Sequence, residues 1–118
     1  MTAHRSTQSA RGLILIDAHA LVGGEREDQY GAPLDCHTSI AEMWAAWLRR
    51  KPGLESIKLT AEDVCWMQVL VKAAREAHAH KRDNLIDAIG YLENAEECRL
   101  ERTRREERER RNTKEEAR

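Results

Sequence analysis

Apolar residues recur at a helical period along most of this chain. In residues 13–22, LILIDAHALV, they fall mainly on one side of a helix, although the LILI run alone would also suit a buried strand. Residues 34–50, LDCHTSIAEMWAAWLRR, follow the i, i+3, i+4, i+7, i+8 pattern, which predicts a second helix with a buried apolar stripe. That stripe consists of Ile40, Met43, Trp44, Trp47 and Leu48. Pro33 suits the first turn of this helix.

Two further helices follow. Residues 60–63, T-A-E-D, resemble a capping box, in which the Thr60 hydroxyl accepts from the Asp63 N–H and the Asp63 carboxylate reaches back. The helix that starts there is apolar around most of its circumference as far as Lys72, which predicts a central position. The last helix starts at Asp83 or one residue earlier. Its predicted inward residues are Leu85, Ile86, Ile89 and Leu92.

No segment shows the alternation that is typical of strands, so the predicted fold is all-α, a four-helix bundle with a charged extension. We expect a disordered N-terminus at 1–11, one helical domain at 12–98 and a charged helical tail at 99–118. The tail holds nine basic and six acidic residues, in a chain whose net charge is −1. Its Glu and Arg residues recur four apart, which favours a solvated helix. A weak anion- or partner-binding arm is the alternative.

Length and composition narrow the function classes. A chain of 118 residues has room for one small domain. No apolar run approaches the ~18 residues of a membrane span, and we expect no membrane partner. Interleaved acidic residues and few aromatics argue against specific nucleic-acid binding. Three cysteines without CxxC spacing indicate reduced thiols in a cytoplasm rather than disulfides or zinc, and the five histidines show no zinc spacing and receive no metal or base role.

The stretch DNLIDAIGY, residues 83–91, is the main candidate for chemistry. Asp83 and Asp87 are four residues apart, so both carboxylates lie on the same side of a helix, which Tyr91 continues. Paired carboxylates suit a hard divalent cation such as Mg²⁺. An acid near a helix N-terminus also stabilises the macrodipole without any metal, and spacing alone favours that interpretation.

Two basic candidates accompany these carboxylates. Lys72 and Arg75, three residues apart, suit phosphate oxygens, although a solvated helix edge would have the same spacing. In the polar loop EREDQYG, residues 25–31, Tyr30 could cover a ligand and Arg26 could meet a phosphate. The alternative for this loop is an ordinary surface turn.

The order of these motifs along the chain resembles that of a known protein family. R-x-x-x-Y-G at 26–31 precedes a Trp-containing helix, and T-x-E-D-V at 60–64, K-x-x-R at 72–75 and D-x-L-x-D-x-x-x-Y at 83–91 follow. Over roughly residues 12–97 the chain resembles small phage and prophage proteins similar to the MazG-like all-α NTP pyrophosphohydrolases, including their nucleotide-modification-associated branch. The resemblance implies an oligomeric helical domain that uses Mg²⁺ or Mn²⁺ to split an NTP or dNTP into monophosphate and pyrophosphate.

The resemblance also implies a site. Asp87 matches the aspartate of the family's E-x-x-D helix, Asp83 precedes that motif, and Tyr91 lies one turn on. Glu62 and Asp63 match the start of the E-E-x-x-E helix, and Lys72 and Arg75 match a phosphate-binding pair. Two motif glutamates are replaced. One position holds Asn84, which can ligate a cation through its carbonyl oxygen but adds no charge, and the other holds Trp66, which cannot ligate a metal ion.

Two other function classes remain open. The replaced glutamates are compatible with a non-catalytic module that binds a nucleotide or a host protein. A structural or scaffolding oligomer, assembled through the charged tail, is the third possibility. In each case we expect a homo-oligomer, a dimer or tetramer, because three tryptophans and a mostly apolar helix exceed what so short a chain buries alone.

Overall fold

The structure is a computed structural model that describes residues 10–22 and 31–117. These ranges contain α-helices and no strands, which confirms the all-α prediction. The helices are α2 (Leu13–Val22), α4 (Pro33–Arg49), α5 (Ala61–His78) and α6 (Arg82–Glu116). Each begins within one residue of its predicted start. Within the described residues, no helix combines the length and the apolar character needed to cross a lipid bilayer.

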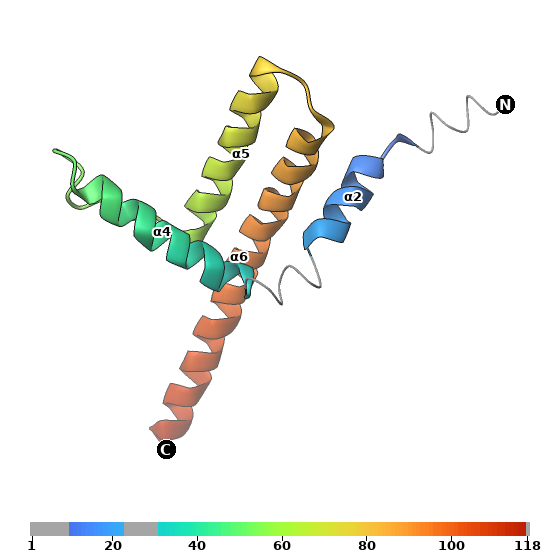
Figure 1. Cartoon of the computed structure of the whole chain (residues 1–118). Helices are drawn as coiled ribbons and strands as arrows, with labels where there is room; N and C mark the ends of the chain where they lie inside the picture. Colours follow the sequence, from blue (N-terminus) through green and yellow to red (C-terminus); the bar gives the residue numbers. More distant parts are fainter. Residues whose placement is uncertain (1–9, 23–30, 118) are drawn as a thin grey trace.

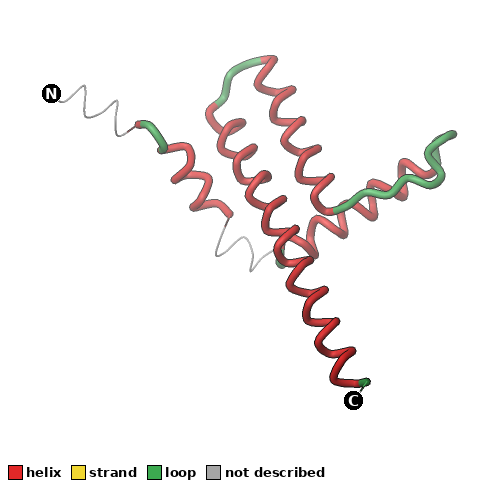
Figure 2. The backbone as a smooth tube through the Cα atoms, turned by 180° about the vertical axis from the view of Figure 1, so that it is seen from behind, coloured by secondary structure: helices red, strands yellow, loops and turns green. Residues whose placement is uncertain are grey.

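Helix α6 organises the fold, because it contacts α2, α4 and α5. Helices α5 and α6 run antiparallel, and a short turn joins them (Figure 1). Helix α2 lies beside the N-terminal half of α6, and α4 crosses the α5–α6 pair steeply (Figures 1 and 2). The predicted central helix was α5, and the structure gives this place to α6.

The start of α5 is fixed by the predicted capping box. The Asp63 N–H donates to Thr60 Oγ1 at 3.1 Å, and the Thr60 N–H donates to Asp63 Oδ2 at 2.8 Å. Two of the backbone donors at this helix end are therefore satisfied, although Asp replaces the usual Glu or Gln. This confirms the cap, and it also means that the Asp63 carboxylate is engaged at the start of α5.

The core consists mainly of small residues. Val64, Cys65 and Cys98 are the largest side chains that are fully buried. The other buried apolar residues are Ala18, Leu34, Ala41, Ala45, Ala61, Ile86 and Ala95. Small side chains let helix axes approach closely, so α4, α5 and α6 meet through alanine and cysteine rather than through their large residues.

Several large apolar side chains are exposed, contrary to the predicted stripe on α4. Met43 is 74% exposed and Trp47 is 66% exposed, while Trp66 and Leu70 on α5 are 56% and 65% exposed. The physical reason is that α4 turns a different face inward. Its buried residues are Leu34, His37, Ala41 and Ala45. On α6, the predicted inward residues Leu85 and Leu92 are exposed, and only Ile86 of that set is buried.

The charged tail continues α6 without a break, and its last turns project away from the other helices (Figure 1). The charge spacing predicted a solvated helix, but the first turns of the tail contact the domain. The Arg102 guanidinium donates two hydrogen bonds to the Glu62 carboxylate, one to each oxygen. Arg105 Nη1 lies 2.7 Å from Asp35 Oδ1. These ion pairs hold the first turns of the tail against α5 and α4 by charge instead of apolar burial.

Candidate functional site

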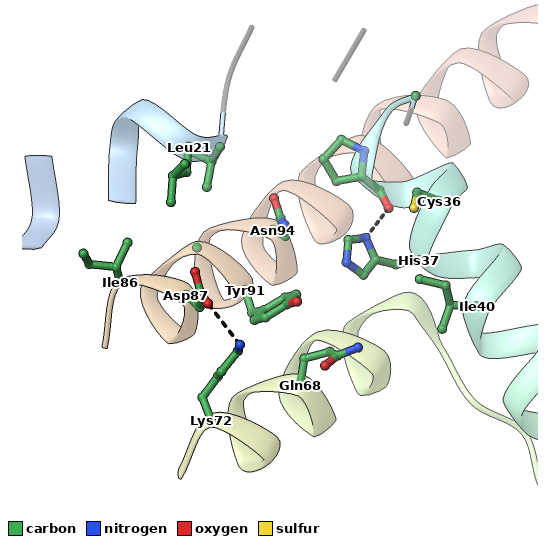
Figure 3. Close-up of a pocket in the computed structure, with 14 residues that line it drawn as sticks. Leu21, Cys36, His37, Ile40, Gln68, Lys72, Ile86, Asp87, Tyr91 and Asn94 are labelled. Atoms are coloured by element: carbon green, nitrogen blue, oxygen red, sulfur yellow. Dashed lines mark hydrogen bonds and ion pairs between the residues drawn. The ribbon is translucent and has the colours of Figure 1, made fainter. Parts of the chain in front are cut away.

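A cavity of about 380 Å³ opens where α2, α4, α5 and α6 meet. Leu21, Ile40 and Ile86 contribute apolar walls. The polar groups around it are His37, Gln68, Lys72, Asp87, Tyr91 and Asn94 (Figure 3). An apolar cavity with a few convergent polar groups is the usual form of a small-molecule site.

The central feature of this cavity is an ion pair between its two long helices. Lys72 Nζ on α5 lies 3.0 Å from Asp87 Oδ2 on α6, and their side chains are 14% and 32% exposed (Figure 3). Gln68 and Lys72 are four residues apart on α5, and Asp87 and Tyr91 are four apart on α6, so each pair shares a helix face. The antiparallel register places these two faces opposite each other across the cavity.

Three predicted site residues therefore come together: Lys72, Asp87 and Tyr91. Asp83 lies one turn before Asp87, is exposed, and does not line the cavity. Arg75 is also exposed and is not among the lining residues, so the predicted Lys–Arg pair is split. Tyr30 and Arg26 lie outside the described residues.

Asn84 has a structural partner instead of a place in the cavity. It is buried, and its Nδ2 donates to Glu76 Oε1 at 3.1 Å. Glu76 Oε1 also accepts from the Lys81 backbone N–H, and Glu76 Oε2 contacts the His80 ring. These bonds, first of all the one from Asn84, lower the pKa of Glu76 from 4.5 to about 2. Glu76 thus ties the α5–α6 turn together.

This network predicts a pH dependence. Because the folded pKa of Glu76 is depressed, its stabilising contribution is full above pH 4.5 and is lost as the pH falls towards 2. Glu76→Gln should therefore have a lower Tm than the wild type at neutral pH, and this gap should narrow in acid. Circular dichroism, recorded during thermal unfolding at several pH values, measures this difference in Tm. The matched control is Glu93→Gln, an exposed acid on α6, and a Glu76→Gln gap that stays constant with pH would contradict this role.

The two predicted carboxylates of α5 lie away from the cavity. Asp63 caps the helix, and Glu62 binds Arg102, whose guanidinium lowers the pKa of the Glu62 carboxyl. Lys72 is nine residues further along than Asp63, which corresponds to ~14 Å along a helix. The structure therefore does not gather the four predicted catalytic carboxylates around one point.

A buried cluster beside the cavity was not predicted from the sequence. Ligand atoms of His37, Cys65 and Cys98 all lie within 4.8 Å of one another. The three residues come from α4, α5 and α6 and are far apart in the chain, so no local spacing could reveal them. Across residues 10–22 and 31–117, this is the one group of at least three His, Cys, Asp or Glu side chains that comes so close.

Comparison with known proteins places the chain in a family. No solved structure is significantly similar to it. The "Gene 55 protein" of Mycobacterium phage L5 is 32% identical over 88 residues, which are 74% of this chain and 53% of that protein. The chain thus spans about half the length of this relative, and the predicted similarity to phage proteins is confirmed at this level. The sequence profile of the domain of unknown function DUF6378 matches residues 13–99, a range that includes every residue of the cavity, so the chain belongs to the DUF6378 family.

Proposed function

We propose that this cavity binds a nucleoside triphosphate, NTP or dNTP, and that the protein hydrolyses it to the monophosphate and pyrophosphate. The observation that carries the proposal is the Lys72–Asp87 pair on the wall of the cavity. The resemblance to MazG-like pyrophosphohydrolases supports it, because Lys72, Asp87 and Tyr91 belong to the matching motifs and line the same cavity.

Lys72 is suited to hold the phosphates. Its side chain is mostly buried, so its ammonium group acts in surroundings of lower dielectric constant than water. Without ligand, Asp87 neutralises it at 3.0 Å. A triphosphate offers stronger anionic acceptors, so Lys72 turns from Asp87 to a phosphate oxygen. This exchange frees the Asp87 carboxylate when the substrate arrives.

The carboxylate oxygens of Asp87 and Asp83 are suitable ligands for Mg²⁺ or Mn²⁺. These cations take oxygen ligands and are usually bound by one or two carboxylates together with substrate phosphates. Asp87 is freed by the exchange at Lys72, and Asp83 lies one turn before it on α6 with an exposed side chain. When bound, the cation would neutralise phosphate charge and activate water for attack on the phosphorus. Asp87 and Asp83 would hold it, and Lys72 would orient the phosphates.

The rest of the cavity is suited to a nucleoside. Gln68 and Asn94 offer amide donors and acceptors, and Tyr91 offers an aromatic ring next to the Lys72–Asp87 pair (Figure 3). Leu21 and Ile40 supply apolar surface. The three free cysteines suit a reducing cytoplasm, and we place the reaction in the cytoplasm of a bacterial host, where nucleotides are available.

A second candidate function is nucleotide binding without hydrolysis. It is favoured by the positions of Glu62 and Asp63, which bind Arg102 and cap α5. Among the described residues that line the cavity, Asp87 is the single carboxylate. Chromatography of reactions with all common NTPs and dNTPs, with Mg²⁺ or Mn²⁺, separates the two candidates. Monophosphate plus pyrophosphate supports hydrolysis, and nucleotide binding without products supports the second candidate. If the protein neither forms products nor binds a nucleotide, both candidates are contradicted.

We further propose a homo-oligomer, a dimer or tetramer, assembled through the exposed apolar side chains of α4 and α5. The radius of gyration is 18.9 Å, whereas a compact domain of this length has about 13 Å. The projecting tail accounts for part of this difference. Exposed side chains as large as Trp47 and Trp66 are typical of surfaces that another chain covers.

Light scattering coupled to size exclusion tests the oligomer. Trp66→Lys places a charge on the proposed contact surface and should shift the protein to a monomer, because a buried unpaired charge is costly. Glu93→Lys, an exposed change on α6, serves as the control and should leave the mass unchanged. A monomeric wild type, or an unshifted Trp66→Lys variant, would count against this assembly.

A further inference from the structure

Three potential metal ligands converge in the core where α4, α5 and α6 meet. His37 comes from α4, Cys65 from α5 and Cys98 from α6, and their ligand atoms lie within 4.8 Å of one another. Both thiols are fully buried, and His37 is nearly so. The cluster contributes one ligand from each helix, so it forms only when the domain is folded. We propose that it binds a soft divalent metal ion, with Zn²⁺ as its natural occupant.

The geometry is close to what zinc requires. Tetrahedral zinc with Zn–S bonds of ~2.3 Å and Zn–N bonds of ~2.0 Å holds its ligand atoms about 3.4–3.8 Å apart. The ligand atoms of the cluster lie within 4.8 Å, so closure requires each pair to approach by at most about 1.4 Å.

One ring nitrogen of His37 is engaged with the backbone, which leaves the other for a metal ion. His37 Nδ1 lies 2.8 Å from the Pro33 carbonyl oxygen, which can only accept, so Nδ1 carries the proton (Figure 3). Nε2 is then the nitrogen with a free lone pair. A backbone carbonyl on the second nitrogen fixes the tautomer and the ring plane of zinc-binding histidines in the same way.

The charge balance also favours zinc. Both thiols are fully buried, and burial disfavours a lone charged thiolate. Binding of Zn²⁺ releases the two thiol protons to solvent and forms two Zn–S bonds. Two thiolates and one divalent cation sum to zero, so no net charge is buried. Sulfur and imidazole ligands select zinc over Mg²⁺ or Ca²⁺.

The cluster is separate from the Lys72–Asp87 pair but borders the same cavity through His37. Three protein ligands leave a fourth position on tetrahedral zinc, which water usually takes. The cavity beside His37 supplies that water. The inference does not depend on nucleotide hydrolysis, because metal binding is measured without a nucleotide.

The test uses the full chain, purified in reducing buffer after expression with added zinc and then dialysed. Elemental analysis should find about one zinc per chain. The metal-free chain titrated with Co²⁺ should develop the thiolate-to-cobalt bands of a four-coordinate site. Cys65→Ser and Cys98→Ser should each lower the zinc content at least tenfold. Cys36→Ser is the matched control, a third free cysteine outside the cluster, and should keep the zinc.

Several results would overturn the proposal. One is a wild-type chain without stoichiometric zinc whose Co²⁺ spectrum is that of the hydrated ion. Another is a Cys65→Ser and a Cys98→Ser variant that both retain zinc. A third is a Cys36→Ser variant that loses as much zinc as those two variants. A Cys65–Cys98 disulfide in the reduced preparation would also overturn it. If the serine variants fail to fold, the Co²⁺ spectrum of the wild type decides alone.

Discussion

Asp87→Asn should reduce nucleotide turnover by a factor of about 10² or more while the domain stays folded. Asparagine keeps the size of the side chain but removes the negative charge that the proposed function uses to hold a cation beside the phosphates. The substitution also removes the partner of Lys72, which lies 3.0 Å away. Because Lys72 is mostly buried and loses the charge of its partner, this loss should cost about 1–3 kcal/mol of stability. Steady-state rates of monophosphate release measure the effect.

The control for this variant is Glu93→Gln, an exposed change of the same kind on the same helix, which should keep wild-type turnover. Circular dichroism and thermal unfolding of Asp87→Asn confirm that the fold is intact. A folded Asp87→Asn protein with near wild-type turnover would contradict the proposed role of this carboxylate.

Lys72→Met should weaken triphosphate binding by about ten- to hundredfold, the range expected when a hydrogen bond to a charged group worth ~1.5–3 kcal/mol is lost. Methionine keeps much of the apolar stem in the cavity wall while it removes the ammonium group. Calorimetric titration with a non-hydrolysable triphosphate analogue, in the presence of Mg²⁺, measures the dissociation constants.

Arg75→Met is the informative control for Lys72→Met. The K-x-x-R spacing predicts that Lys72 and Arg75 act together, but the structure leaves Arg75 exposed and outside the cavity. We therefore expect Arg75→Met to change the affinity by no more than about twofold, as is usual for a surface substitution. Equal losses in the two variants would mean that phosphate is bound along the outer face of α5 and not in the cavity.

The local parts of the fold could be predicted because their causes are local. The capping box of Thr60 and Asp63 depends on residues three apart, and Pro33 fits a first helical turn regardless of what the helix contacts. Helix existence and the all-α class follow from period and propensity in the same way. Helix starts were accordingly predicted to within one residue.

The inward faces could not be predicted in the same way. The large residues Met43 and Trp47 follow a perfect helical stripe, yet α4 meets its neighbours through Ala41 and Ala45. A hydrophobic stripe shows that a face needs covering, and it does not show whether the same chain or another chain covers it. The contacts of Arg102 and Arg105 were missed for a related reason, because their acidic partners are distant in the sequence.

The residue types of the site could be predicted from the sequence, but the register of α5 against α6 could not. Lys72, Asp87 and Tyr91 are recognisable from their motifs, but only the register of α5 against α6 decides that Lys72 meets Asp87 and that Asn84 meets Glu76. The His37–Cys65–Cys98 cluster depends entirely on three helices meeting, so it carries no signal in the sequence.

The most direct test of the central claim is a crystal structure of the chain with a non-hydrolysable nucleoside triphosphate and Mg²⁺. We expect the nucleotide in the cavity between α2, α4, α5 and α6, with a phosphate oxygen within hydrogen-bond distance of Lys72 Nζ and the cation against Asp87. A nucleotide bound elsewhere, for example on the arginines of the tail, with the Lys72–Asp87 pair intact, would contradict it.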